Sequence, residues 1–463
     1  MFKTTRRLLL PAALITVGAF GLTACGSGQQ ANDASDGLLM WTLEVQPDRL
    51  ATQQTMLDGF TAETGIEVEL VPVEQDQVAQ LMAAAALSNE MPDLLGSVPL
   101  GLVRNFDSEG YASSDISAAA VDALGADTFS SGALDLTSDG GRQLSVPSDA
   151  WAQILVYRTD LFDAAGLAAP TTYDTLLTAA ETLTTGDQFG ITLSTDPAGS
   201  FTQETFEAVA LGNNCQLVND DGSVALDSPE CTAAIELYTA LAQDYSPAGT
   251  QDVVSTRASY FAGQSAMIMW STFLLDEMAG LRDDAAPSCD ECTTSTWLAE
   301  NSGIVPLITG PNAGDNAGSF GEMTSFVPTS AASPEETQQL IEYVMGDGYV
   351  EWFGMAPEGK FPVRLGTADN PTEFSDAWAE LETGVDSRAA LGDIYEAATI
   401  DTLTGAAASM SRWAFLQGQG EIVGVLSAEL PIAKIIADAG SGAIDAATAQ
   451  QEMVEAVDEI ASR

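Results

Sequence analysis

From residue 38 onward, short apolar runs alternate with amphipathic stretches, and this alternation restricts the fold. The runs "LLMWTLEV" at 38–45 and "IEVELVPV" at 66–73 have the composition of buried strands, and residues 47–63 between them are typical of a helix. A second helix is expected at 77–88, followed by the strand "DLLGSV" at 93–98. Strand, helix and strand in this order predict a parallel α/β sheet.

The N-terminal segment has the layout of an export signal. Three basic residues precede an uncharged run from Leu8 to Phe20, which is shorter than the roughly 20 residues of a membrane-spanning helix. The sequence "LTAC" at 22–25 resembles the lipobox of bacterial lipoproteins, which implies a signal peptide at 1–25 that ends at the lipobox cysteine. Cleavage before Cys25 would leave it as the first mature residue, lipidated with acyl chains such as palmitate. A secreted protein with a chance cysteine is the alternative. Arg6-Arg7 leaves both general and twin-arginine export open.

A polar stretch follows the proposed lipidation site. Residues 26–37, "GSGQQANDASDG", have no periodicity and predict a flexible tether that holds a folded body away from the membrane. Together with Cys25 this tether predicts a protein anchored at the extracellular face of the cell membrane. After this signal, no further apolar segment long enough to span a membrane occurs in the sequence.

The mature chain would be strongly acidic. Loss of the signal leaves 12 basic residues against 67 acidic ones, a net charge of −55, and the chain contains no histidine. Such a charge repels nucleic acid and anionic lipid, so a nucleic-acid partner is excluded. Because molar salt shortens the screening length to about 3 Å, this composition favours a salt-adapted, halophilic protein over an ordinary acidic exported one.

The cysteines agree with export into an oxidising compartment. Besides Cys25 the chain has an even set of four, namely Cys215, Cys231, Cys289 and Cys292. Three connectivities are possible, and proximity in sequence favours pairing 215 with 231 and 289 with 292. The "CDEC" motif at 289–292 could instead be half of a metal site, but no second pair or histidine accompanies it. We expect no metal and no cofactor.

Two helix starts are specified by their first residues. Ser228-Pro229 places a capping hydroxyl directly before a proline at the first helical position. Ser333 and Glu336 have the spacing of a capping box, with Pro334 between them.

Several segments together resemble one protein family. The stretch 150–184, "AWAQILVYRTDLFDAAGLAAPTTYDTLLTAAETLT", resembles the most recognisable part of the family 1 extracellular solute-binding proteins, the maltose-binding-protein-like receptors of ABC importers. Other matching segments follow in the family's order: "MPDLLGSV" at 91–98, "YFAGQSAMIMWSTFLL" at 260–275, "FGEMTSFVPTSAASPEETQQLIEYVM" at 320–345 and "GKFPVR" at 359–364.

The resemblance implies a two-lobed α/β fold with a ligand cleft between the lobes. Lobe one would comprise residues 38–148 plus 305–347, and lobe two residues 149–304 plus 348–463. A ligand that contacts both lobes would stabilise a closed form, which the permease subunits of the importer recognise. The chain would then be a monomeric receptor and not an enzyme.

Carbohydrate is the ligand class that the family segments favour. Sugars present apolar C–H faces and a rim of hydroxyls, so aromatic rings and carboxylates suit them. The resemblance places seven such residues near the cleft: Glu44, Ser97, Trp151, Trp270, Phe273, Glu322 and Trp413. Each has a structural alternative, because tryptophans beside apolar runs often belong to the core, carboxylates are often solvated and serines often cap helices.

Two alternatives remain open from the sequence. An acidic cleft with aromatic rings also suits a polyamine or a quaternary ammonium osmolyte such as betaine. Moreover, "DLLGSV" lacks the aromatic residue that several sugar-binding relatives have after this strand. The other alternative is an exported glycosidase with two catalytic carboxylates. The absence of histidine excludes Ser-His-Asp triads and histidine-ligated zinc.

Overall fold

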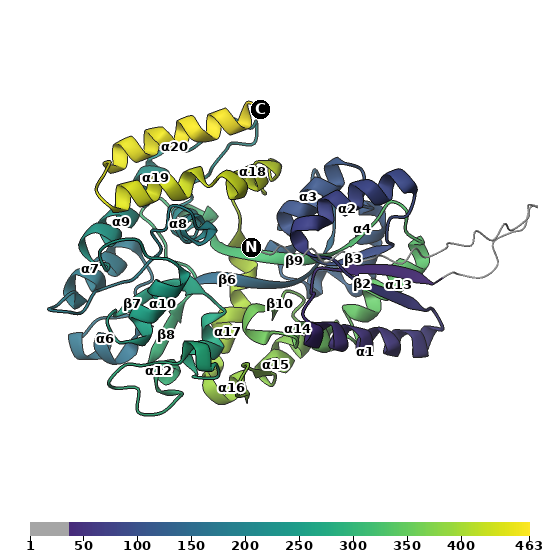
Figure 1. The fold of residues 1–463 in the computed structure, drawn as a ribbon, viewed down its shortest axis with the longest axis horizontal. Coiled ribbons are helices and arrows are strands. Elements are labelled where there is room, and N and C mark those ends of the chain that lie inside the picture. The colour runs from purple at the N-terminus through teal and green to yellow at the C-terminus, as the bar shows by residue number, and fades with distance from the viewer. Residues whose placement is uncertain (1–36) are drawn as a thin grey trace, which may run out of the picture. The chain divides into compact units, whose positions relative to one another are not determined.

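Two long strands, β6 (Val146–Arg158) and β9 (Ser319–Pro328), connect the two halves of the folded body. The computed structural model describes residues 37–463. The two strands pair antiparallel, with Ala150 opposite Met323. Figure 1 shows both strands running between two groups of helices.

Three parallel strands extend the sheet from one half of this pair. β1 lies between β2 and β3, so that Met40 is opposite both Leu70 and Leu94. β3 then pairs antiparallel with β9. This arrangement confirms the parallel strand–helix–strand pattern predicted from the sequence. The strands are β1 (Leu38–Thr42), β2 (Val68–Pro72) and β3 (Leu94–Pro99).

Helices cover this first sheet and connect its strands. The first of them ends where Gly65, at φ 78°, donates its backbone N–H to Thr61, a left-handed conformation that glycine adopts without strain. The helices are α1 (Pro47–Thr64), α2 (Gln75–Ser88), α3 (Leu100–Ser108), α4 (Ser114–Leu124), α5 (Ser131–Leu136) and α13 (Pro334–Val344).

The other half of β6 forms a second sheet. β7 (Met267–Ser271) and β8 (Ser302–Val305) both pair antiparallel with it, so that Leu155 is opposite Met269 on one side and Val305 on the other. The helices of this region are α6 (Thr159–Ala165), α7 (Tyr173–Leu183), α8 (Ser200–Gly212), α9 (Pro229–Asp244), α10 (Val253–Phe261), α11 (Leu274–Met278) and α12 (Trp297–Glu300).

The C-terminal part of the chain adds short strands and helices to both regions. β10 (Phe361–Pro362) pairs with β6, and β13 (Met410–Ser411) pairs with β9. Two small ribbons join β4 (Ser138–Asp139) to β5 (Arg142–Gln143) and β11 (Glu382–Thr383) to β12 (Ala389–Ala390). The helices are α14 (Tyr349–Phe353), α15 (Glu373–Ala379), α16 (Leu391–Ile394), α17 (Ala397–Ala406), α18 (Glu421–Glu429), α19 (Pro431–Gly440) and α20 (Ala446–Ala461).

The packing of α14 bears on the predicted lobe boundary after residue 347. The ring of Trp352, in α14, lies 4.5 Å from that of Phe326 in β9. A Cβ atom on Gly96 of β3 would lie 3.3 Å from the Trp352 ring. Helix α14 therefore packs against the first sheet, although the sequence-based division assigned it to lobe two.

The two predicted helix starts have different outcomes. Ser228 Oγ accepts a hydrogen bond from the backbone N–H of Cys231 and Pro229 begins α9, which confirms that start. Helix α13 also begins at Pro334, but the Ser333 side chain makes no capping hydrogen bond. The capping box is therefore wrong, because the backbone N–H of Ser333 donates to Asp93 Oδ1 at 2.9 Å instead of to Glu336.

Both favoured disulfide pairs are present. Cys215 and Cys231 are joined and fully buried, linking the end of α8 to the start of α9. Cys289 and Cys292 form the second bond. In this state the "CDEC" sulfurs are bonded to each other, so they are not free thiolates for a metal.

The predicted signal peptide at 1–25, the lipidation site Cys25 and nearly all of the predicted tether at 26–37 lie outside the described residues. Within residues 37–463, no helix combines the length and the apolar character that crossing a membrane requires.

Candidate functional site

A cleft of about 690 Å³ lies beside the crossing strands. Residues of α2 and α3, among them Leu102, line one wall, and residues of α18, among them Glu421, line the other. Glu322 of β9, with Arg412 and Phe415 from the segment after β13, lies between these walls. The volume falls within the range of pockets that hold small organic ligands.

The crossing strands place an indole ring and a carboxylate on one face. Trp151 of β6 is directly opposite Glu322 of β9, and directly opposed residues of an antiparallel pair project from the same face. The half-buried Trp151 ring lies 5.7 Å from the Phe320 ring and 6.3 Å from that of Phe273. The structure therefore brings three of the predicted site residues, Trp151, Phe273 and Glu322, to one place.

Arg412 is the cation of this site. Its buried guanidinium forms ion pairs with Glu207 of α8, at 3.1 Å, and with Glu322. It also lies over the Phe320 ring, 4.5 Å from the ring centre. Two carboxylates and an aromatic face hold the guanidinium in position, while the Glu322 side chain keeps 22% of its surface exposed.

Carboxylates outnumber cations around Arg412. Burial raises the pKa of Glu204, and the charges of Glu322 and Glu207 raise it further, so that it reaches about 7 despite the opposing effect of Arg412. Burial likewise raises the pKa of Glu207. Three carboxyl groups therefore share one guanidinium, and near neutral pH Glu204 can either donate or accept a hydrogen bond.

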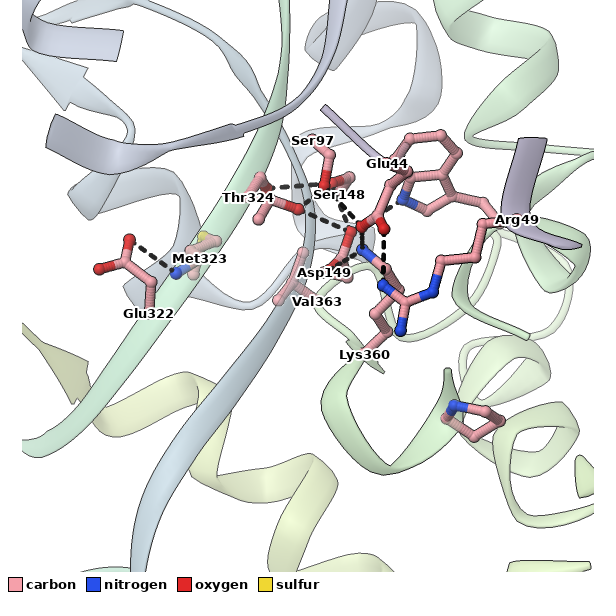
Figure 2. A network of polar contacts seen from close by, with 12 residues as sticks. Glu44, Arg49, Ser97, Ser148, Asp149, Glu322, Met323, Thr324, Lys360 and Val363 are labelled. Atoms are coloured by element: carbon pink, nitrogen blue, oxygen red, sulfur yellow. Dashed lines mark hydrogen bonds and ion pairs between the residues drawn. The ribbon is translucent and has the colours of Figure 1, made fainter. Parts of the chain in front are cut away.

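Glu44 and Ser97 belong to a separate buried network (Figure 2). Glu44 accepts hydrogen bonds from Ser97 Oγ, at 2.9 Å, and Arg49 Nη1, at 2.6 Å, and pairs with Lys360 Nζ at 2.7 Å. Burial alone would raise the pKa of Glu44, but the charges of Lys360 and Arg49 lower it to about 2. Both of these predicted site residues are thus engaged within the protein.

Asp149 completes this network from β6. Its carboxylate accepts hydrogen bonds from Lys360 Nζ (2.9 Å), Trp352 Nε1 (2.8 Å), Thr324 Oγ1 (2.9 Å) and Ser148 Oγ (2.7 Å). Burial alone would lower the pKa of Lys360, but Asp149 and Glu44 raise it above its ordinary value. Lys360 is therefore a fully charged ammonium held between two carboxylates, as Figure 2 shows.

The buried network and the Trp151–Glu322 pair lie next to each other on one face of the paired strands β6 and β9. Asp149 is opposite Thr324, and Trp151, two residues further along β6, is opposite Glu322. Residues two apart in a strand project to the same side. The row at Asp149 is covered by Lys360, which follows η4 (Pro357–Gly359), whereas the row at Trp151 is partly exposed.

The other two tryptophans predicted for the site lie in the core. Trp270 is 5% exposed, donates its indole N–H to the Val253 carbonyl and packs edge-on against Phe201. Trp413 is 1% exposed and donates its indole N–H to the Cys215 carbonyl. In this structure neither ring joins Trp151, which differs from the expectation of stacking surfaces, because protein groups already cover both rings.

Sequence reasoning missed the charged partners of both clusters. Arg412 lies within the segment "MSRWAF", directly before Trp413, the residue that the resemblance assigned to the site. Lys360 is one of only three lysines in the chain, and in such a lysine-poor sequence a single lysine could have indicated a specific structural role. Glu204, Glu207 and Asp149 carry no such signal, since they are three of 67 acidic residues.

Comparison with known proteins identifies relatives of the whole folded body. The family model described as bacterial extracellular solute-binding protein matches residues 46–351. The putative ABC transporter periplasmic-binding protein YcjN of Escherichia coli (strain K12) is 24% identical over 375 residues, covering 79% of this chain and 82% of that protein.

Two solved structures have a similar fold. The cyclic alpha-maltosyl-1,6-maltose binding protein of Arthrobacter globiformis matches with a TM-score of 0.67 and 17% identity, over 92% of this chain and 98% of that one. Maltose-bound MalE3 of T. maritima matches with a TM-score of 0.63 and 18% identity, over 91% and 99%. These matches confirm the two-lobed α/β fold class predicted from the sequence.

Proposed function

This chain belongs to the bacterial extracellular solute-binding proteins, and we propose that it is the receptor of an ABC importer that captures a carbohydrate, in particular an oligosaccharide, and delivers it to the permease. The crossing strands carry the proposal, because they set the half-exposed ring of Trp151 opposite Glu322, whose carboxylate lines the cleft. An aromatic face packs on the C–H face of a sugar ring, and carboxylate and guanidinium groups bind its hydroxyls.

The geometry around the cleft supports capture by closure. The cleft walls come from α2 and α3, which cover the first sheet, and from α18, which follows β13 in the C-terminal part of the chain. A ligand that touches both walls gains contacts only when they approach each other, so it favours the closed form. The permease would then recognise the closed form, in which the two walls lie close together.

Membrane attachment is part of the proposal and rests on the sequence. Lipidation of Cys25 would anchor the receptor, as a monomer, at the extracellular face of the cell membrane, with residues 26–37 as the tether. Two or three acyl chains give stable anchoring where one is marginal.

A cationic solute is the second candidate. The observation that favours it is the excess of carboxylates around Arg412, where Glu204, Glu207 and Glu322 face a single guanidinium. An ammonium group on the ligand would offset that excess and could also lie against the Trp151 ring. A polyamine or a betaine-like osmolyte has this chemistry.

Isothermal titration calorimetry on the full chain in molar salt separates these candidates. The titrants are malto-, cello- and xylo-oligosaccharides, followed by betaine, choline and spermidine. We expect saturable binding of one sugar series, weakened at least tenfold in Trp151→Ala. Trp297→Ala is the matched control, because that partly buried ring lies against Arg158 in the second sheet region.

Each other result has a defined meaning. Binding of cationic solutes alone would replace the carbohydrate with the second candidate. Release of reducing sugar during the titration would show glycosidase activity and contradict the receptor role. No binding of any titrant would reject both ligand classes.

A further inference from the structure

One end of the cleft is closed by an aromatic side chain. Phe415 lines the 690 Å³ cleft and also lines a second hollow of about 490 Å³, so it stands between the two. Asp135 and Leu416 line this second hollow and a third one of about 950 Å³. The three hollows therefore follow one another along the segment after β13, with Phe415 at the first boundary.

Arg104 of α3 holds this boundary in place. Its guanidinium carbon lies 5.5 Å from the centre of the Phe415 ring, and its Nη2 donates to the Ser138 carbonyl at 2.6 Å. The same guanidinium pairs with Asp139 at 3.3 Å. Phe415 is 2% exposed and Arg104 6%, so both side chains are packed within the protein.

Close packing at Gly420 and the guanidinium of Arg412 also restrict the Phe415 ring. A Cβ atom at Gly420 would lie 3.1 Å from the Phe415 ring and 3.2 Å from Arg104 Cγ. The guanidinium of Arg412, on the cleft floor, lies 5.9 Å from the same ring. Phe415 is thus held between one arginine in the cleft and another behind it.

The hollow behind Phe415 has an acidic lining that suits hydroxyl groups. Asp135 and Asp139 line it together with Ser138 and Gln143, whose side chains hydrogen-bond each other at 2.8 Å. A longer chain of sugar units would meet suitable polar partners there if the ring did not stand in the way.

We propose that Phe415, held by Arg104, is the end wall of the cleft and sets the maximum length of the oligosaccharide that the receptor accepts. This inference rests on the proposed function, since it assigns a length limit to the same cleft. A shortened side chain at 415 would join the cleft to the second hollow, so additional sugar units could bind.

The test is calorimetric titration of the full chain with complete length series, from glucose to maltoheptaose and from cellobiose to cellohexaose. We expect the affinity of the unchanged protein to rise with length and then to fall at a defined length. In Phe415→Ala we expect the sugar just above that limit to bind about tenfold more tightly relative to the shorter sugars, so that the fall in affinity moves to a greater length.

Phe374→Ala is the matched control. That ring is also buried, at 3% exposed, and also contacts an arginine, with the Arg364 guanidinium 5.2 Å from its centre, but it does not line the cleft. Phe415→Leu and Arg104→Met provide milder changes of the end wall should Phe415→Ala not fold, and thermal melting of each variant checks this.

The outcomes separate the inference from the function on which it rests. Length profiles that coincide in the unchanged protein, the Phe415 variants and Arg104→Met would overturn the end wall and leave the carbohydrate receptor standing. An identical shift in Phe374→Ala would also overturn it, because the effect would then be a general loss of packing. Binding of no sugar by any form would reject the proposed function and the end wall together.

Discussion

Replacement of Lys360 is the sharpest test of the buried charge network. Lys360→Met keeps much of the side-chain volume but removes the ammonium that pairs with Glu44 at 2.7 Å and with Asp149 at 2.9 Å. The lysine and both carboxylates are buried, at 4%, 7% and 2% exposed. Two carboxylates would then remain in the interior without their shared cation.

The expected loss of stability at pH 7 is about 3–5 kcal/mol, the usual cost of removing one partner of a buried ion pair. The pKa of Glu44 gives the scale of the charge interactions. It falls from 4.5 to about 2, and at about 1.4 kcal/mol for each pH unit this shift corresponds to about 3 kcal/mol. Lys360 and Arg49 produce this shift together against the effect of burial, so it belongs to the whole cluster and not to Lys360 alone.

The pH dependence has a defined sign. Because folding lowers the pKa of Glu44, its contribution is present above pH 4.5 and is lost as the pH falls toward 2. In Lys360→Met the Glu44 carboxylate keeps only Arg49 as a cation, so burial, which raises its pKa, is less opposed and protonation of Glu44 is favoured. The stability difference between the two proteins should therefore shrink steadily from pH 7 to pH 3.

Urea unfolding followed by tryptophan fluorescence, repeated between pH 3 and pH 8 in molar salt, measures this difference. Lys434→Met is the control, because Lys434 is exposed and donates only to the backbone carbonyl of Glu429. A loss below about 1 kcal/mol at pH 7, or a difference that does not change with pH, would refute the reasoning.

Two further predictions concern other parts of the body. The double variant Cys215→Ala/Cys231→Ala should lower the free energy of unfolding by about 3 kcal/mol, because that disulfide closes a loop with a sequence separation of 16. The double variant Cys289→Ala/Cys292→Ala should lower it less, because its separation is only 3. Urea unfolding compares the two double variants, and equal losses would contradict the loop-closure argument. Folding raises the pKa of Glu204 from 4.5 to about 7, so this carboxyl destabilises the fold progressively as the pH rises through that interval. Glu204→Gln should therefore be more stable than the unchanged protein by about 1–3 kcal/mol at pH 8 and similar to it at pH 5 in urea unfolding. Glu421→Gln, at the exposed edge of the cleft, is the control. The same gain in that variant would argue against the burial of Glu204 as the cause.

The sequence was sufficient for the parts of the fold that local pattern determines. The strands at 38–42 and 68–72, with a helix between them, follow from apolar runs that only a sheet covered by helices can bury. The disulfide pairs follow from proximity in the chain. The failed capping box shows the limit of such patterns, since Asp93, 240 residues earlier in the sequence, took the hydrogen bond assigned to Glu336.

The candidate site was less accessible to sequence reasoning because exposure is a tertiary property. Trp151, Trp270 and Trp413 all lie beside apolar runs, yet only the first keeps part of its ring uncovered. The carbonyl of Cys215 and the ring of Phe206, both in or after α8, cover Trp413, and nothing near "MSRWAF" indicates that α8 packs there. Covering partners distant in the sequence cannot be recognised from a local motif.

The buried charges and the exposed ring are connected through one strand. Asp149 is fixed by four donors, and Trp151 lies two residues further along the same face of β6. A buried ion pair adds little net stability over a well-packed apolar pair, so its effect here is the unique position that it imposes on the crossing strands. With Asp149 held, the strand positions of Trp151 and of the opposing Glu322 are held too, so a ligand at the proposed site would not have to order them. Loss of Lys360 should therefore weaken binding as well as folding, even at pH values where the protein remains folded.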